Sequence, residues 1–139
     1  MGIINQQNGN FQITDKIVVG KDKSYEDILK LAPTNKTWDV KNGYKWIYFS
    51  DIKIDKLFFN IRVCFHNERL FCIDFGFTDK LDENLTWDNW SEKDELKRKD
   101  IYEDWLTTVI GKKRNFDWGN IGAYFDPKGG TTSMYIKYI

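Results

Sequence analysis

Hydrophobic and polar positions alternate along much of this chain, which is the period of a β-strand. Residues 44–78 predict consecutive strands, in the runs YKWIYFS, DIKI, KLFFNIRVCFH and LFCIDFGFT. The run IGAYFDPKGGTTSMYIKYI at 121–139 predicts a further hairpin. Residues 11–19 also alternate, and they predict a first strand near the N-terminus. We therefore expect about six strands, mostly antiparallel.

Two other segments have the spacing of helices. Ser24 is placed to cap a short helix that runs to about Leu31. Ser91 is placed to cap a long helix with Asp94 in its first turn, and Gly111 is the matching stop. The long helix has one apolar face, and we expect this face to pack on the sheet. It is formed by Ile101, Tyr102, Trp105, Leu106 and Val109.

The register of two hairpins follows from keeping apolar side chains on one face. With residues 67–69 as the first loop, the predicted pairs are Phe59 with Phe77, Ile61 with Phe75, Val63 with Ile73 and Phe65 with Phe71. On the opposite face Arg62 then faces Asp74, and Cys64 faces Cys72. With residues 127–130 as the second loop, the predicted pairs are Phe125 with Thr132, Ala123 with Met134 and Ile121 with Ile136.

These elements predict one α+β domain over residues 1–139. Its twisted, mostly antiparallel sheet would carry the long helix on one face and the short helix near the N-terminus. The last strand would lie inside the sheet, so we expect its removal to unfold the domain. The chain has 41% hydrophobic residues and no apolar run long enough for a membrane span. With no signal-peptide pattern at the N-terminus, we expect a cytoplasmic protein.

The net charge is zero, but residues 79–104 carry ten acidic and five basic side chains. This acidic block argues against direct nucleic-acid binding, which needs a concentration of positive charge. It suits a basic protein partner. The alternative is a solvated helix face with no partner.

No residue set in the sequence matches a catalytic or cofactor-binding motif. His66 is the only histidine, and Cys64 is two residues away on the same face, so a Cys64/His66 dyad is geometrically conceivable but lacks an orienting group. Metal-ligand spacings and glycine-rich phosphate loops are absent from the sequence. We expect Cys64 and Cys72 to be a pair of small thiols, with a strained cross-strand disulfide as the alternative. No metal, cofactor or catalytic residue is therefore predicted.

Tryptophan is unusually frequent, with six in 139 residues. Trp105 on the long helix and Trp46 within a strand are expected to be in the core. Trp87 and Trp90 stand in the polar run ENLTWDNWSEKD and are harder to bury together. They either cover the sheet edge and the start of the helix or anchor a partner.

The run TWDNWSEKDELKRKDIYEDWL, followed by FDWGNIGAYFDPKGGTTSMYIKYI, resembles a group of small bacterial proteins that share a helix of the form W-S-E-x-x-E-x-x-R-K-x-x-x-x-x-W-L. The resemblance covers about residues 44–139. The group is associated with immunity proteins of bacterial toxin systems, including contact-dependent inhibition. The resemblance implies a protein that binds and blocks a cognate toxin, without enzymatic activity of its own.

The predicted partner is therefore a toxin domain, for example a nuclease with a basic surface. We expect the contacts to come from the acidic block, through Asp82, Glu83, Trp87, Asp88 and Trp90. A competing hypothesis is an enzyme or small-ligand carrier that uses the concave face of the sheet. A third is a structural domain that self-associates.

Overall fold

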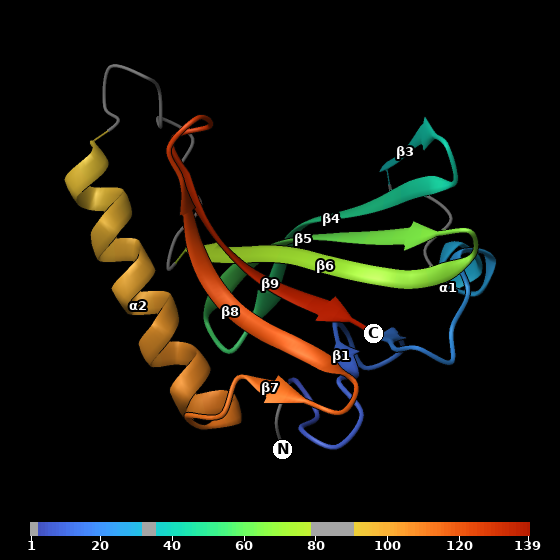
Figure 1. Cartoon of the computed structure of the whole chain (residues 1–139), viewed down its shortest axis with the longest axis horizontal. Helices are drawn as coiled ribbons and strands as arrows, with labels where there is room; N and C mark the ends of the chain where they lie inside the picture. Colours follow the sequence, from blue (N-terminus) through green and yellow to red (C-terminus); the bar gives the residue numbers. More distant parts are fainter. Residues whose placement is uncertain (1–2, 32–35, 79–90) are drawn as a thin grey trace.

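Figure 1 draws the chain as a computed structural model, which describes residues 3–31, 36–78 and 91–139. In these ranges the fold is α+β, with a large antiparallel sheet, a small two-stranded sheet and two helices, one of them long. The elements are β1 (Phe11–Gln12), β2 (Val18–Val19), α1 (Tyr25–Leu31), β3 (Lys36–Lys41), β4 (Tyr44–Ile54), β5 (Leu57–His66), β6 (Arg69–Thr78), α2 (Glu92–Ile110), β7 (Asn115–Phe116), β8 (Gly119–Asp126) and β9 (Thr131–Tyr138).

The large sheet has seven described strands in the order β3-β4-β5-β6-β9-β8-β7. The C-terminal strand β9 pairs with both β6 and β8, so it lies inside the sheet as predicted. Its two edge strands, β3 and β7, were not expected, whereas the expected strand over residues 11–19 lies outside this sheet. All six residues of β3 are exposed, and β7 has only two residues, so neither has the alternation of a half-buried strand.

The predicted single strand over residues 11–19 is wrong. Its two ends form β1 and β2, which pair as a tight hairpin with Phe11 opposite Val19. The middle turns because the Thr14 hydroxyl accepts hydrogen bonds from the backbone N–H groups of Lys16 and Ile17. The buried side chains Phe11 and Ile13 join the core from this hairpin.

The predicted register of the β5–β6 hairpin is confirmed up to Cys64, which pairs with Cys72. Closer to the turn it is wrong, because Phe65 pairs with Leu70 and not with Phe71. The turn has two residues with positive φ, Asn67 at 50° and Glu68 at 70°. Such a tight turn leaves one extra residue in β6, and the resulting bulge leaves Phe71 41% exposed.

The β8–β9 hairpin has the predicted register throughout. Its confirmed pairs are Phe125 with Thr132, Ala123 with Met134 and Ile121 with Ile136. The short helix α1 begins as predicted after Ser24, whose hydroxyl accepts from the Asp27 N–H at 3.2 Å. The Asp27 carboxylate accepts from the Ser24 N–H in return, and these bonds lower the pKa of Asp27.

Helix α2 starts and stops where the sequence predicts. The Ser91 hydroxyl accepts from the Asp94 N–H at 3.3 Å, and Gly111 follows the last turn with φ of 88°. Tyr102 and Leu106 are buried, and Trp105 packs half-buried against the core. The assignment of Ile101 to this face is wrong, since its side chain is 55% exposed. The other four predicted residues of this face, Tyr102, Trp105, Leu106 and Val109, pack in or against the core.

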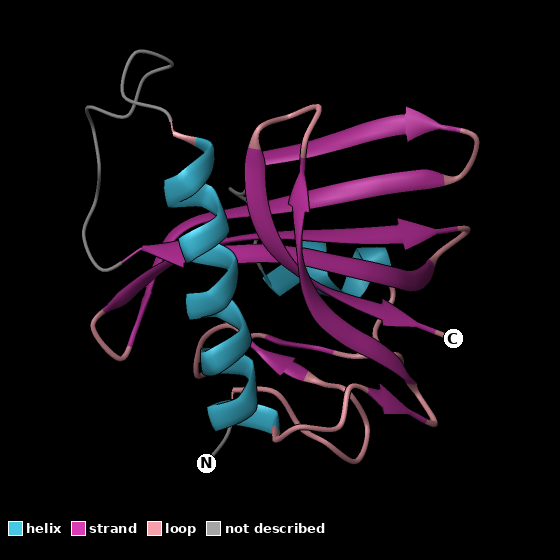
Figure 2. Cartoon of the chain, turned by 60° about the vertical axis from the view of Figure 1, so that its left-hand side comes forward, coloured by secondary structure: helices cyan, strands magenta, loops and turns pink. Residues whose placement is uncertain are grey.

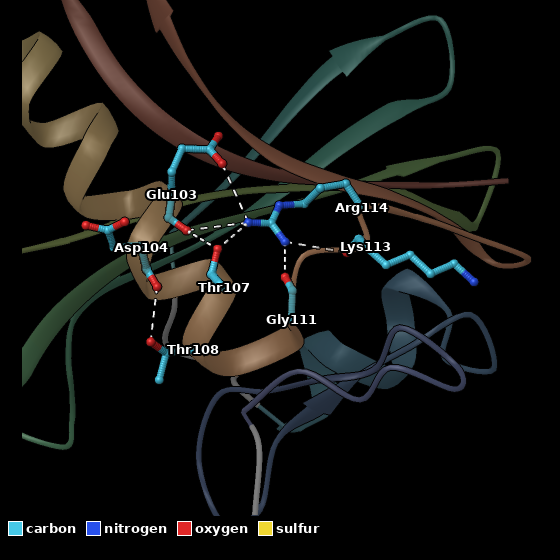
Figure 3. A network of polar contacts seen from close by, with 7 residues as sticks. All are labelled: Glu103, Asp104, Thr107, Thr108, Gly111, Lys113 and Arg114. Atoms are coloured by element: carbon cyan, nitrogen blue, oxygen red, sulfur yellow. Dashed lines mark hydrogen bonds and ion pairs between the residues drawn. The ribbon is translucent and has the colours of Figure 1, made fainter.

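Arg114 caps the C-terminal end of α2, as Figure 3 shows. Its guanidinium donates to the Gly111 carbonyl, to Thr107 Oγ1 at 3.0 Å and to the Glu103 carbonyl at 3.4 Å, and it pairs with the Glu103 carboxylate at 3.6 Å. A cation is favourable here because the last carbonyls of a helix lack partners. The basic turn after α2 is thus structural, at least through Arg114.

The core lies on one face of the large sheet, which we call the covered face. Both helices and the N-terminal hairpin contact it, through Tyr25 against Phe65, Trp105 against Phe59, and Phe11 against Phe75. Figure 2 shows α2 running along the front of the curved sheet. The central strands supply the covered face with Ile47, Phe49, Phe59, Ile61, Val63, Phe65, Ile73, Phe75, Ile121, Met134 and Ile136.

Candidate functional site

The other face of the sheet points away from the contacts made by the helices. Because successive side chains of a strand alternate between faces, it is formed by the residues between the core positions. We call it the open face, and its residues are Trp38, Trp46, Tyr48, Arg62, Cys64, Cys72, Asp74, Tyr124, Ser133, Tyr135 and Lys137.

Aromatic rings and cations lie beside one another on the open face. Trp38 is 54% exposed and is directly opposite Trp46 across the β3–β4 pair. Lys36 Nζ lies 5.9 Å from the ring centroid of Tyr48, and Lys137 Nζ lies 5.9 Å from that of Tyr135. The expected core position of Trp46 is therefore not borne out, since it is half-buried on this face and outside the core cluster.

An ion pair with a tyrosine crosses the middle of the open face. Arg62 Nη2 lies 3.1 Å from Asp74 Oδ2, and the Tyr124 hydroxyl donates to the same oxygen at 3.1 Å. Burial raises the pKa of Asp74, against the opposing influence of Arg62 and Tyr124. Burial, and then the nearby Asp74 charge, also raises the pKa of Tyr124. The three side chains come from β5, β6 and β8, so they fix one another across the sheet.

The sheet opens into a fork where β6 and β9 separate. Their pairing ends at Phe75 with Met134, so the backbone groups after Phe75 in β6 and before Met134 in β9 need other partners. The Tyr102 hydroxyl accepts from the Phe77 N–H and donates to the Phe77 carbonyl, both at 3.0 Å. On the opposite side the buried Glu95 carboxylate accepts from the Thr132 N–H at 3.1 Å. Two side chains of α2 thus close the fork.

A pocket of about 360 Å³ lies above this fork. Arg62 from the open face and Arg98 from α2 are in its lining, and Arg98 Nε is 3.7 Å from the Glu95 carboxylate. Hydroxyl-bearing residues in the lining are Tyr48, Ser50, Thr78, Tyr102, Thr131, Thr132 and Ser133, and its apolar residues are Phe49, Ile61, Phe75 and Phe77. The fork pocket therefore combines hydrogen-bonding groups with apolar walls.

A larger cleft of about 650 Å³ lies on the helix side, between the N-terminal hairpin, the β4–β5 turn and α2. Its walls include Ile54, Leu57 and Trp105, and Asp15 and Asp55 also line it. The cleft thus has both apolar and polar walls, and its volume falls within the range of small-molecule sites, about 300–1,000 Å³.

The conceivable Cys64/His66 dyad is not assembled. The His66 ring stacks on Tyr44 with centroids 4.2 Å apart, and the edge of Phe71 approaches it. Cys64 is buried, and its thiol donates to the Phe65 carbonyl at 3.9 Å. Within residues 3–31, 36–78 and 91–139, no three histidine, cysteine or acidic side chains cluster as a metal site would require.

The residues predicted to contact a partner, Asp82, Glu83, Trp87, Asp88 and Trp90, lie outside the described residues. The open face, the fork and the cleft were not singled out from the sequence. Alternation predicts that Trp46, Tyr48 and Arg62 share one face of two neighbouring strands. Only the packing of the helices decides which face of the sheet is covered.

Comparisons with known proteins do not assign a function, so the assignment rests on the geometry described above. No family model matches the chain, and neither a curated protein nor a solved structure matches it. In the part of the chain that the structure describes, neither helix is long and apolar enough to cross a membrane.

Proposed function

We propose that this chain is a binding protein that recognises another protein through the open face, and that it serves as an immunity protein against a bacterial toxin. The observation that carries the proposal is the concentration of tryptophan, tyrosine and arginine on a sheet face that neither helix contacts in the described residues. These residue types are the ones most enriched at the centres of protein interfaces.

The geometry suits recognition because the face is rigid. Its side chains stand on long paired strands, and Arg62, Asp74 and Tyr124 hold one another through bonds of 3.1 Å. Side chains that are already ordered lose little conformational entropy when a partner binds. Trp38 and Trp46 extend the same surface towards the edge strand β3.

Immunity requires no chemistry from the chain itself. A tight complex that covers the toxin's active site, or a neighbouring site, is enough to block it. If the toxin is a nuclease with a basic surface, the acidic block at 79–104 would speed association through charge attraction. The contacts proposed for Asp82, Glu83, Trp87, Asp88 and Trp90 would then extend the interface beyond the open face.

The test begins with the gene immediately upstream, since an immunity gene normally follows its toxin. The encoded C-terminal domain is expressed under an inducible promoter, with and without this chain. We expect growth arrest without the chain, rescue with it, and a purified complex of the two proteins. Arrest that persists despite soluble expression of the chain would contradict the immunity role.

Variants then locate the interface. Trp38→Ala with Arg62→Ala should weaken the complex strongly, while Trp87→Ala with Asp88→Ala tests the segment predicted from the sequence. Ile101→Ala is the matched control, because this exposed side chain lies on α2. All variants are compared for melting temperature, so that loss of fold is distinguished from loss of contact.

The second candidate is a small-ligand carrier or enzyme, and the cleft beside Trp105 favours it. This function predicts a rise in melting temperature with a particular class of metabolite. Trp105→Leu should abolish that rise, whereas Trp38→Ala on the open face should leave it intact. A metabolite screen without any such shift would remove the support for this candidate.

A further inference from the structure

The two cysteines of the chain lie at the centre of the open face. The register places Trp46, Cys64, Cys72 and Lys137 in one row across β4, β5, β6 and β9. Both thiols are free in the structure. Neither belongs to the core cluster of the covered face.

The backbone already holds the two cysteines at the separation of a disulfide. Residues directly opposite each other in an antiparallel pair have Cα atoms about 4.5–5.5 Å apart. Disulfides join residues whose Cα atoms are about 4.4–6.8 Å apart. A bond between them therefore needs rotation of side chains and no change of register.

The two thiols differ in access and in charge environment. Cys64 is 1% exposed, whereas Cys72 is half-buried. The neighbouring Cys64 thiol lowers the pKa of Cys72, and the positive charges of Lys137 and Arg62 act in the same direction, against burial and Asp74. The neighbouring Cys72 thiol and burial raise the pKa of Cys64. Cys72 is thus the thiol that an external oxidant reaches first.

We infer that Cys64 and Cys72 form a reversible dithiol–disulfide couple that is oxidised by hydroperoxides, with Cys72 as the reacting thiol and Cys64 as the resolving one. This inference does not depend on the identity of a partner. It is consistent with a reducing compartment, where protein disulfides are usually transient.

The chemistry balances in two steps. The Cys72 thiolate attacks one peroxide oxygen, and the O–O bond breaks. Cys72 becomes a sulfenic acid, and the other peroxide oxygen leaves as hydroxide or alkoxide, which takes up the proton that the Cys72 thiol had released. The Cys64 sulfur then attacks the Cys72 sulfur, the S–O bond breaks, and water leaves with the Cys64 proton. The two thiols together lose two hydrogens, and the peroxide is reduced.

The first experiment treats the purified full chain with hydrogen peroxide and measures its intact mass. We expect a monomer lighter by two hydrogens, restored by dithiothreitol, with an unchanged circular dichroism spectrum. Trypsin cleaves at Arg62, Arg69 and Lys80, so the disulfide should appear as peptide 63–69 linked to peptide 70–80. A peroxide dose that oxidises Cys72 to sulfinic acid without this linkage would overturn the inference, as would a disulfide found only between two chains.

Matched variants test the order of the steps. In Cys64→Ser, dimedone should trap a sulfenic acid at Cys72, because no resolving thiol is present. In Cys72→Ser, Cys64 should stay reduced at the same dose. Trapping at Cys64 in preference to Cys72 would overturn the assigned roles. Circular dichroism verifies that each variant is folded. If a variant does not fold, the mass measurement on the unmodified chain still tests the inference.

Discussion

The covered and open faces belong to the same strands, yet they are held together differently. On β5, Phe59, Ile61 and Val63 are 0–1% exposed, while Asn60 and Arg62 between them are exposed. The covered face gains its stability from apolar burial against helices and hairpin. The open face instead pairs its charges and leaves aromatic rings accessible. Under the proposed function, stability and recognition lie on opposite sides of one sheet, and substitutions should separate them.

The largest effect is expected on the covered face. Phe75→Ala removes a ring that is 1% exposed and lies 4.9 Å from the Phe11 ring. We expect a loss of about 3–5 kcal/mol in the free energy of unfolding, because a cavity is left in a packed core. Urea denaturation measures it. Trp38→Ala on the open face is the control, with a change of about 0.5 kcal/mol or less, and equal losses would erase the distinction between the faces.

A smaller effect is expected at the fork, where α2 meets the sheet. Tyr102→Phe deletes the hydroxyl that satisfies both backbone groups of Phe77. We expect a loss of about 1–3 kcal/mol, because these groups are left without their partner. Tyr124→Phe is the matched control, since its hydroxyl lies on the open face and is partly accessible to water. A smaller loss for Tyr102→Phe than for Tyr124→Phe would contradict the closing role of Tyr102.

The smallest effect concerns the charge at the centre of the open face. Because the pKa of Asp74 is raised above its ordinary value of 3.8, folding favours the protonated carboxyl. Its contribution to stability is present below the unfolded pKa and is lost as pH rises through the folded one. We expect the stability of the natural chain relative to Asp74→Asn to fall over this interval, as measured by urea denaturation at several pH values. A rise with pH would show that Arg62 outweighs burial.

The strands and α2 could be predicted because their patterns are local. Alternation gave the pairing of Ile61 with Phe75 and of Ile121 with Ile136, and Ser91 and Gly111 gave the helix ends. The edge strand β3 could not be predicted, because an exposed strand buries no alternate residues. The bulge at Phe71 depends on the geometry of a two-residue turn, which the apolar pattern does not specify.

The candidate site was less accessible to sequence reasoning than the fold. Glu95 lies in the acidic first turn of α2, yet it is buried at the fork, where its carboxylate accepts from the Thr132 N–H of a distant strand. That contact depends on how α2 lies across the sheet. Tyr102 and Glu95 are seven residues apart and share a helix face, which is the only signal that could have linked them. Which face of the sheet stays open is likewise a result of tertiary packing.

The central claim is that the open face binds a protein partner without carrying the stability of the fold. The most direct measurement is the dissociation constant of the complex with the upstream-encoded toxin domain, for Trp38→Ala combined with Arg62→Ala. We expect a loss of at least about tenfold in affinity, about 1.4 kcal/mol, with a nearly unchanged melting temperature. Ile101→Ala should bind like the natural chain. Unchanged affinity in the double variant would contradict the claim.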